Sequence, residues 1–230
     1  MQRELLAGTG FSKSLILTVL INALNRLLCN TNAVFLSIQG KGLKLLTEKE
    51  RFIALCEEIH RDGIGELMNW LESSDFYTAP ASTRYHGSRP GGLLTHSINV
   101  YEELKRILQI YPDVDVSEET VAIVSLFHDL CKVNFYVSEK RNRKNEDGKW
   151  ESYDSYTIKE KFCFGGHGSK SVFIVQNFIK LTPAEAAAIN CHMGAFGDNG
   201  EYVGKTFEQY PLAFLLHMAD CAATYLRESD

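Results

Sequence analysis

The stretch VAIVSLFHDLCKV, residues 121–133, decides how the rest of the chain is interpreted. The residues before the histidine are apolar apart from one serine, which predicts a helix buried in the protein core. The run leads into the adjacent pair His128 and Asp129. Imidazole and carboxylate groups are common protein ligands of divalent metal ions. The stretch therefore suggests a metal site built between packed helices, for which hydrolysis is the chemistry to test first.

Further histidines and an aspartate surround this pair in the order His96, His128-Asp129, His167, His192, His217 and Asp220. A lone histidine beside apolar residues is more often a hydrogen-bonded core residue than a ligand. Most of these histidines lie next to apolar helical segments, and the set as a whole favours a metal site. His217 and Asp220 are three residues apart, which places both on one helical face. The glycines around His167 would let the backbone approach a metal ion or a phosphate closely.

Composition limits the class of protein. The chain has 230 residues, of which 45% are hydrophobic and 23% are charged, as expected for a soluble globular protein with one large core or two small ones. The net charge of −5 provides no overall attraction for nucleic acid. No run approaches the roughly 20 apolar residues that span a bilayer. We therefore expect no membrane partner.

Cysteine usage predicts a reducing compartment. The six cysteines include no C-x-x-C pair, and Cys56, Cys131 and Cys221 sit inside apolar helical runs. This distribution is typical of free, buried thiols and not of a disulfide framework. A cytoplasmic location is the expectation that follows.

Charge divides the chain into two predicted parts. Residues 1–46 carry a net charge of +4, so that the remainder carries −9. This first part has a helix-like pattern near 12–28 and a possible strand in AVFLSI, residues 33–38. We predict that residues 1–46 form an N-terminal extension, to which the sequence assigns no role. The compact domain is predicted to cover residues 47–230.

The predicted domain is mostly helical. Thr47 and Glu50 form a capping-box pattern at the start of its first helix. Thr182 and Glu185 repeat this pattern around Pro183, which suits a first helical position. Beyond the first segment, helices are predicted near 93–111, 117–133, 168–180, 183–193 and 210–228.

Residues 134–164 are the exception. Aromatic and β-branched residues flank Asp147-Gly148, a strong signal for a β-hairpin. The hairpin contains the basic run KRNRK, residues 140–144, with acidic residues on either side. Two interpretations remain open at this stage: a solvated hairpin tip, or a flap that contacts substrate phosphates.

Five segments in order resemble one known family. They are GGLLTHS (91–97), LFHDLCK (126–132), GGHGSKS (165–171), CHMG (191–194) and LLHMAD (215–220). The order resembles the HD-domain superfamily of metal-dependent phosphohydrolases, nearest to the branch of bacterial 3′–5′ exoribonucleases of the YhaM type. The resemblance covers about residues 85–226. It implies an all-α fold, an HD-domain helical bundle, here with an inserted β-hairpin near 134–164.

The resemblance also implies a set of site residues. One metal ion would be held by His96, His128, Asp129 and Asp220. Asp129 would bridge to a second metal ion, completed by His167 and His192. A two-metal site can stabilise both the attacking and the leaving oxygen of a phosphoester. The implied cofactor is one or two divalent ions, and Mn²⁺, Fe²⁺, Ni²⁺, Co²⁺ and Mg²⁺ all suit these ligands.

Other residues receive secondary roles from the same resemblance. Lys132 lies one turn after His128 and would face a substrate phosphate, so that Asp129 and Lys132 are the predicted catalytic pair. His217 would support the ligands from the second shell. His86 and Arg89 are candidates for substrate contacts, with solvated loop residues as an equally good interpretation.

Two departures from the family pattern bear on the predicted function. Cys131 stands where the family usually has glycine, and residues 1–46 are too short for the OB-fold that precedes the domain in the exoribonucleases. The second departure favours a small phosphoester, such as a nucleotide, as the substrate of a metal-dependent phosphohydrolase. The alternatives are a 3′–5′ exonuclease acting on RNA or single-stranded DNA, and a non-catalytic regulatory module that binds a nucleotide.

Overall fold

A computed structural model describes residues 36–39, 42–83, 87–159, 165–197 and 200–228. Its contacts divide the chain into two units, Met1–Thr47 and Glu48–Asp230. In the first unit, strands β1 (Leu36–Gln39) and β2 (Gly42–Leu45) pair antiparallel. The strand expected at 33–38 is described from Leu36 onward, and the helix expected near 12–28 lies outside the described residues.

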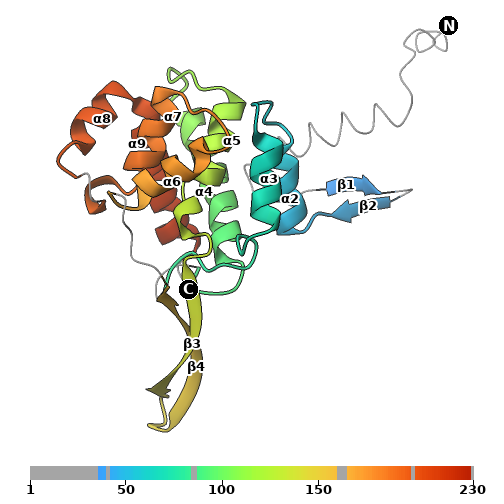
Figure 1. Ribbon diagram of the computed structural model, residues 1–230, viewed down its shortest axis with the longest axis vertical. Helices are drawn as coiled ribbons and strands as arrows, with labels where there is room; N and C mark the ends of the chain where they lie inside the picture. The colour runs from blue at the N-terminus through green and yellow to red at the C-terminus, as the bar shows by residue number, and fades with distance from the viewer. Residues whose placement is uncertain (1–35, 40–41, 84–86, 160–164, 198–199, 229–230) are drawn as a thin grey trace, which may run out of the picture. The chain divides into compact units, whose positions relative to one another are not determined.

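The second unit is a bundle of helices with one inserted hairpin (Figure 1), which confirms the predicted fold class. Its α-helices are α2 (Glu48–Cys56), α3 (Ile64–Glu72), α4 (Gly92–Ile110), α5 (Glu118–Phe127), α6 (His167–Gln176), α7 (Pro183–Cys191), α8 (Val203–Gln209) and α9 (Pro211–Ala222). Shorter turns are the 3₁₀ helices η1 (Leu130–Lys132) and η2 (Gly194–Phe196) and the π-helical turn η3 (Ala223–Arg227). Within the described ranges, no helix combines the length and the apolar character needed to cross a membrane.

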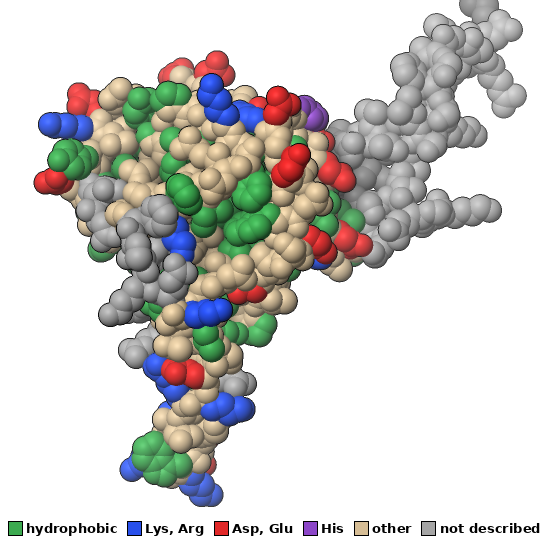
Figure 2. All heavy atoms as spheres, in the orientation of Figure 1, with side chains coloured by type: hydrophobic (Ala, Val, Ile, Leu, Met, Phe, Trp, Pro, Cys, Tyr) green, Lys and Arg blue, Asp and Glu red, His purple; other side chains and the backbone are tan. Residues whose placement is uncertain are grey.

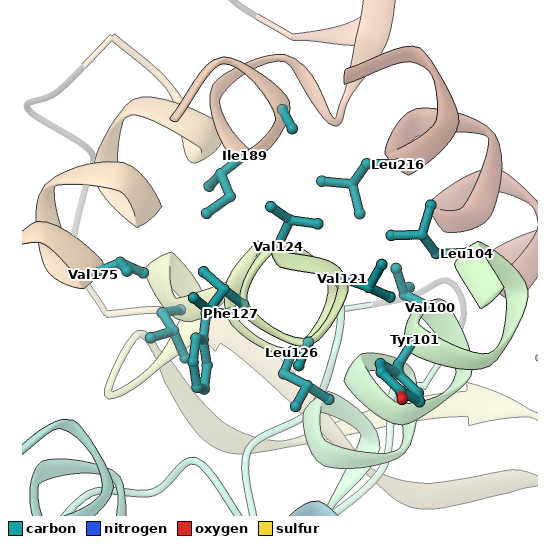
Figure 3. Close-up of a cluster of buried hydrophobic side chains, with 14 of the residues drawn as sticks. Val100, Tyr101, Leu104, Val121, Val124, Leu126, Phe127, Val175, Ile189 and Leu216 are labelled. Carbon is teal, nitrogen blue, oxygen red and sulfur yellow. The ribbon is translucent and has the colours of Figure 1, made fainter. Parts of the chain in front are cut away.

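Helix α5 lies at the centre of the bundle. Its residues 121–127 are all buried, as expected for a helix that is apolar on every side. Figure 3 looks along this helix and shows its side chains pointing outward all round. Around them lie Leu104 of α4, Val175 of α6, Ile189 of α7 and Leu216 of α9. The whole bundle is therefore assembled around the stretch that leads into His128.

Two predicted helix starts are confirmed by their capping bonds. The hydroxyl of Ser117 accepts a hydrogen bond from the backbone N–H of Thr120 at 3.1 Å and begins α5. Thr182 and Glu185 form a complete capping box, and Pro183 occupies the first turn of α7. Each cap satisfies backbone N–H groups that a helix leaves without partners at its N-terminus.

Two helices differ from the prediction. Helix α5 ends at Phe127 and not near residue 133, because Asp129 leaves helical geometry with φ −108° and ψ 19° and the chain then forms η1. Helix α8 was not expected, since its seven residues, VGKTFEQ, are too few and too mixed to show a helical period.

The inserted hairpin consists of β3 (Tyr136–Lys144) and β4 (Trp150–Ile158), which pair antiparallel along their full length. The turn lies at Asp147-Gly148 as predicted, and Gly148 adopts φ 75°, a left-handed conformation that glycine accepts at low cost. The hairpin extends away from the helices of its unit (Figure 1). It connects η1, which follows the His-Asp pair, to α6, which begins at His167.

Basic side chains are distributed along this hairpin (Figure 2). Two of them form ion pairs within it: Arg141 with Glu139, and Arg143 with Glu151 at 2.6 Å. The ammonium group of Lys144 lies 5.6 Å from the centre of the Trp150 ring. Because the acidic neighbours already satisfy both arginines, these contacts favour the solvated-tip interpretation of the basic run.

A partly buried group of ion pairs joins the loop after α2 to the first turns of α5 and α7. Arg61 donates hydrogen bonds to Glu185 of α7 at 2.7 Å and to Glu119 of α5 at 3.0 Å. The Glu185 side chain has no exposed surface and also accepts a hydrogen bond from Thr120 at 2.8 Å. One carboxylate therefore ties the loop after α2 to both α5 and α7.

We predict that Glu185→Ala lowers the free energy of unfolding by about 3 kcal/mol, because it leaves Arg61 without its buried partner. Urea unfolding at pH 7 measures this loss. The matched control is Glu72→Ala, which breaks the exposed Lys49–Glu72 pair and should cost less than about 1 kcal/mol. Equal losses in the two variants would contradict the role given to Glu185.

The same pair predicts a pH dependence. Burial raises the pKa of Glu185, but the hydrogen bonds from Arg61, the Thr182 backbone and Thr120 outweigh burial and lower it overall. A carboxyl group whose pKa is lowered by folding stabilises the protein when the pH is above the pKa of the unfolded state, which is about 4.3 for glutamate. The stability difference between wild type and Glu185→Ala should therefore shrink as the pH falls below this value.

Candidate metal centre

Five predicted ligands meet in the interior of the second unit. His96 comes from α4, His128 and Asp129 from the end of α5, His192 from the end of α7, and Asp220 from α9. The three histidines have no exposed surface, and Asp129 is 2% exposed. Burial of this many polar groups in one place is costly unless they are paired with one another or with a ligand.

The distances between the ligand atoms are short. His96 Nε2 lies 3.1 Å from Asp220 Oδ1, 3.6 Å from Asp129 Oδ2 and 3.3 Å from His128 Nε2. Asp129 Oδ1 lies 3.5 Å from His192 Nε2. Two overlapping groups have all their ligand atoms within 4.8 Å of one another: His96, His128 and Asp129; and His128, His192 and Asp220.

Two of the histidines are oriented by the helix ends on which they sit. His128 is the C-terminal capping residue of α5, and its Nδ1–H donates to the carbonyl of Ser125 at 2.8 Å. His192 caps α7 in the same way and donates to the carbonyl of Ile189 at 2.6 Å. A carbonyl only accepts, so the proton is on Nδ1 and each Nε2 is left to bind a metal ion. The partial negative charge at both helix ends also favours a cation.

Asp129 is held by Lys132. The Lys132 ammonium lies 2.5 Å from Asp129 Oδ2, and the lysine is 9% exposed. Burial raises the pKa of Asp129, but Lys132, His128 and His192 outweigh burial and hold it well below its usual range. Burial lowers the pKa of Lys132, and Asp129 raises it overall. Both side chains are therefore charged at neutral pH.

His96 shows that the cluster is suited to positive charge. Burial lowers its pKa, yet hydrogen bonds to Asp220 and Glu228 raise it to about 10. Burial raises the pKa of Asp220, but the contact with His96 brings it well below its usual range. The carboxylates beside His96 therefore favour positive charge in this part of the cluster, which suits a bound cation.

The donor set fits a divalent metal ion. Imidazole nitrogen and carboxylate oxygen suit Mn²⁺, Fe²⁺, Co²⁺, Ni²⁺ and Zn²⁺. Among the described residues, His192 Nε2 is one of the few buried side-chain atoms that makes no hydrogen bond, although it points at Asp129. Such an atom is expensive to bury without a partner, and a metal ion would supply one.

Of the remaining predicted residues, His167, His217 and Arg89 are described, and they lie outside the two ligand groups. The Nδ1 atom of His167 lies 3.5 Å from the sulfur of Cys131, so the second metal set with His167 remains a prediction. His217 Nδ1–H donates to the carbonyl of His192 at 2.7 Å, which suits the supporting role predicted for it. Arg89 donates to the hydroxyl of Thr95 at 3.2 Å. His86 lies outside the described residues.

The structure shows a close backbone contact at Gly168. This residue is one of the glycines around His167 that were predicted to let the backbone approach a metal ion or a phosphate. A Cβ at this position would lie 2.1 Å from the carbonyl oxygen of Asn190, so the close approach is between the backbones of α6 and α7. The contact between His96 and Glu228 was not predicted. Glu228 also accepts a hydrogen bond from Asn99, which was not predicted. No spacing rule connects a residue on α4 with one so far along the chain.

Comparison with protein families assigns the chain. The family model described as "HD domain" matches residues 93–222, more than half of the chain. The chain belongs to the HD-domain family. This chain is 29% identical over 83 residues to a dihydroneopterin 2′,3′-cyclic phosphate phosphodiesterase of Methanocaldococcus jannaschii. The match covers 35% of this chain and 31% of that relative, so the chain spans about a third of the relative's length. No solved structure matched significantly.

Family membership supports a general chemistry. HD domains are metal-dependent, and this HD-domain protein has His and Asp clusters that could bind a metal ion. The match to a phosphodiesterase supports metal-dependent phosphohydrolase activity in general.

We predict that Gly194→Ala disturbs the centre through His217. Gly194 has φ 57°, and a Cβ there would lie 2.5 Å from Cε1 of His217, the ring that donates to the His192 backbone. The variant should bind Co²⁺ more weakly, as followed by the visible absorption of the bound ion. Gly204→Ala is the control, because a Cβ at position 204 meets no atom within 4 Å. Unchanged Co²⁺ affinity in Gly194→Ala would contradict the prediction.

Proposed function

We propose that this HD-domain protein is a metal-dependent hydrolase of a phosphodiester bond in a small molecule. The observation that carries the proposal is the convergence of three histidines and two aspartates, among which His192 Nε2 is buried and makes no hydrogen bond. A site that had lost catalysis would be expected to lose ligands as well. The presence of these five residues therefore favours an enzyme over a non-catalytic module that only binds a nucleotide.

The proposed ligands of the metal are His96, His128, Asp129, His192 and Asp220. A divalent ion bound there would lower the pKa of water and polarise a phosphoryl oxygen. The protein's own contribution begins with the two helix-end hydrogen bonds, which keep the protons of His128 and His192 on Nδ1. Asp129 stays ionised beside Lys132, and Lys132 provides a fixed positive charge next to the centre. We assign Lys132 to contact the phosphate that is cleaved.

Substrate choice rests on two arguments. The named relative acts on a 2′,3′-cyclic phosphate, which makes cyclic phosphodiesters the first class to test. Nucleotides remain the broader substrate class. The polynucleotide alternative receives little support from the hairpin, since Arg141 and Arg143 are engaged by Glu139 and Glu151.

We predict that Asp129→Ala abolishes hydrolysis and Co²⁺ binding while the helices still form. The variant removes a carboxylate that lies within 3.6 Å of His96, His128 and His192. It also removes the ion-pair partner of the buried Lys132. Hydrolysis of bis(p-nitrophenyl) phosphate, Co²⁺ titration and circular dichroism measure the three properties. Asp147→Ala, in the exposed hairpin turn, should behave as wild type. If Asp129→Ala hydrolysed the substrate at the wild-type rate, the proposed metal centre would be refuted.

A substrate panel tests the proposed class. We expect EDTA to remove activity and divalent ions to restore it. With the restoring ion, 2′,3′-cyclic nucleotides should be cleaved faster than p-nitrophenyl phosphate, a monoester, and faster than short RNA. Preference for the monoester would replace the phosphodiesterase proposal. Preference for RNA, with binding that weakens steeply as salt increases, would establish the exonuclease alternative.

A further inference from the structure

The turn η3 and the residue after it have an inverted distribution of polarity. Tyr225 and Leu226 are 67% and 80% exposed. The side chains of Arg227 and Glu228 are only 17% and 8% exposed. Burial of apolar surface would favour the opposite arrangement. Some other interaction must therefore hold the charged residues inside.

Helix α4 supplies that interaction. Glu228 Oε2 lies 3.1 Å from Nδ1 of His96, and Glu228 Oε1 accepts a hydrogen bond from the amide of Asn99 at 2.8 Å. His96 and Asn99 are three residues apart and so lie on one face of α4. A carboxylate can only accept, so the ring of His96 donates to it through Nδ1–H.

Arg227 fixes the turn next to this contact. Its guanidinium pairs with Glu102 and lies 3.5 Å from a carboxylate oxygen of Glu103, both on α4. Arg51 of α2 binds Glu102 from the other side. The turn is π-helical, a form that often occurs at functional sites. Arg227 and the next residue, Glu228, both contact α4. Arg227 therefore anchors the turn to α4, and the neighbouring Glu228 contacts His96.

We propose that Glu228 is a positioning residue for the metal centre, which holds the proton of His96 on Nδ1 and directs its Nε2 toward Asp129 and Asp220. The inference rests on the proposed metal centre. It adds Glu228, which is not one of the five proposed ligands, as a residue that orients one of them. His128 and His192 obtain the same orientation from backbone carbonyls at their own helix ends. His96 lies within the first turns of α4, where its Nδ1 has a carboxylate from a distant segment instead.

The test is metal affinity without substrate, which separates this proposal from the proposed hydrolysis. Glu228→Ala should weaken Co²⁺ binding by about 10- to 100-fold, the usual cost of losing such a partner. Glu228→Gln keeps an acceptor oxygen but loses the charge, and its affinity should fall between wild type and Glu228→Ala. In Zn²⁺-loaded protein with ¹⁵N-labelled histidine, the Nδ1–H signal of His96 should be protected from exchange in wild type and exposed in Glu228→Ala.

Glu103→Gln is the matched control, because Glu103 also contacts Arg227 from α4, while its other ion pair is with Arg106 and not with a ligand histidine. It should retain wild-type Co²⁺ affinity. Equal weakening in Glu103→Gln and Glu228→Ala would show that Glu228 acts only by anchoring the turn, and would overturn the proposal. So would Co²⁺ affinity in Glu228→Ala within twofold of wild type. Tight Co²⁺ binding without hydrolysis in wild type would refute the proposed function and leave this test intact.

Discussion

The C-terminus of α5 has to end inside the protein, and much of the centre follows from that constraint. A helix surrounded by other helices cannot direct its last carbonyl groups to water, so other donors must satisfy them. At α5 the ring of His128 satisfies Ser125, and at α7 the ring of His192 satisfies Ile189. The hydrogen bond from Nδ1 to the carbonyl group at each helix end also directs Nε2 of the same ring toward the buried cluster of histidines and aspartates. Helix termination and ligand orientation are thus one interaction.

Local signals were sufficient to predict much of this architecture. Ser117 and the Thr182-Glu185 box start helices because they bond to backbone groups a few residues away. Gly148 marks the hairpin turn because few other residues accept its φ angle. Five of the histidines and aspartates that the family resemblance predicts as ligands lie close together in the structure, although they are far apart in the chain.

The features that were missed or misjudged depend on contacts between distant segments. The pattern of α5 continues past Phe127, and nothing local indicates that Asp129 leaves the helix to meet Lys132 and the neighbouring histidines. The close contact between Gly168 and the backbone of α7 was not predicted, because the sequence does not show which segment lies beside it. Glu228 could not be found by spacing, since its partners lie on α4.

The proposed ligands come from α4, from α9 and from the C-terminal ends of α5 and α7, so the proposed centre forms only when these four helices pack together. An ion that needs all of them binds the folded chain and has little affinity for the unfolded one. By mass action, a free ion at one hundred times its dissociation constant adds about 2.7 kcal/mol to stability, a large part of what a typical domain has. Under the proposed assignment, the lifetime of this protein against unfolding and proteolysis would depend on the supply of free metal around it.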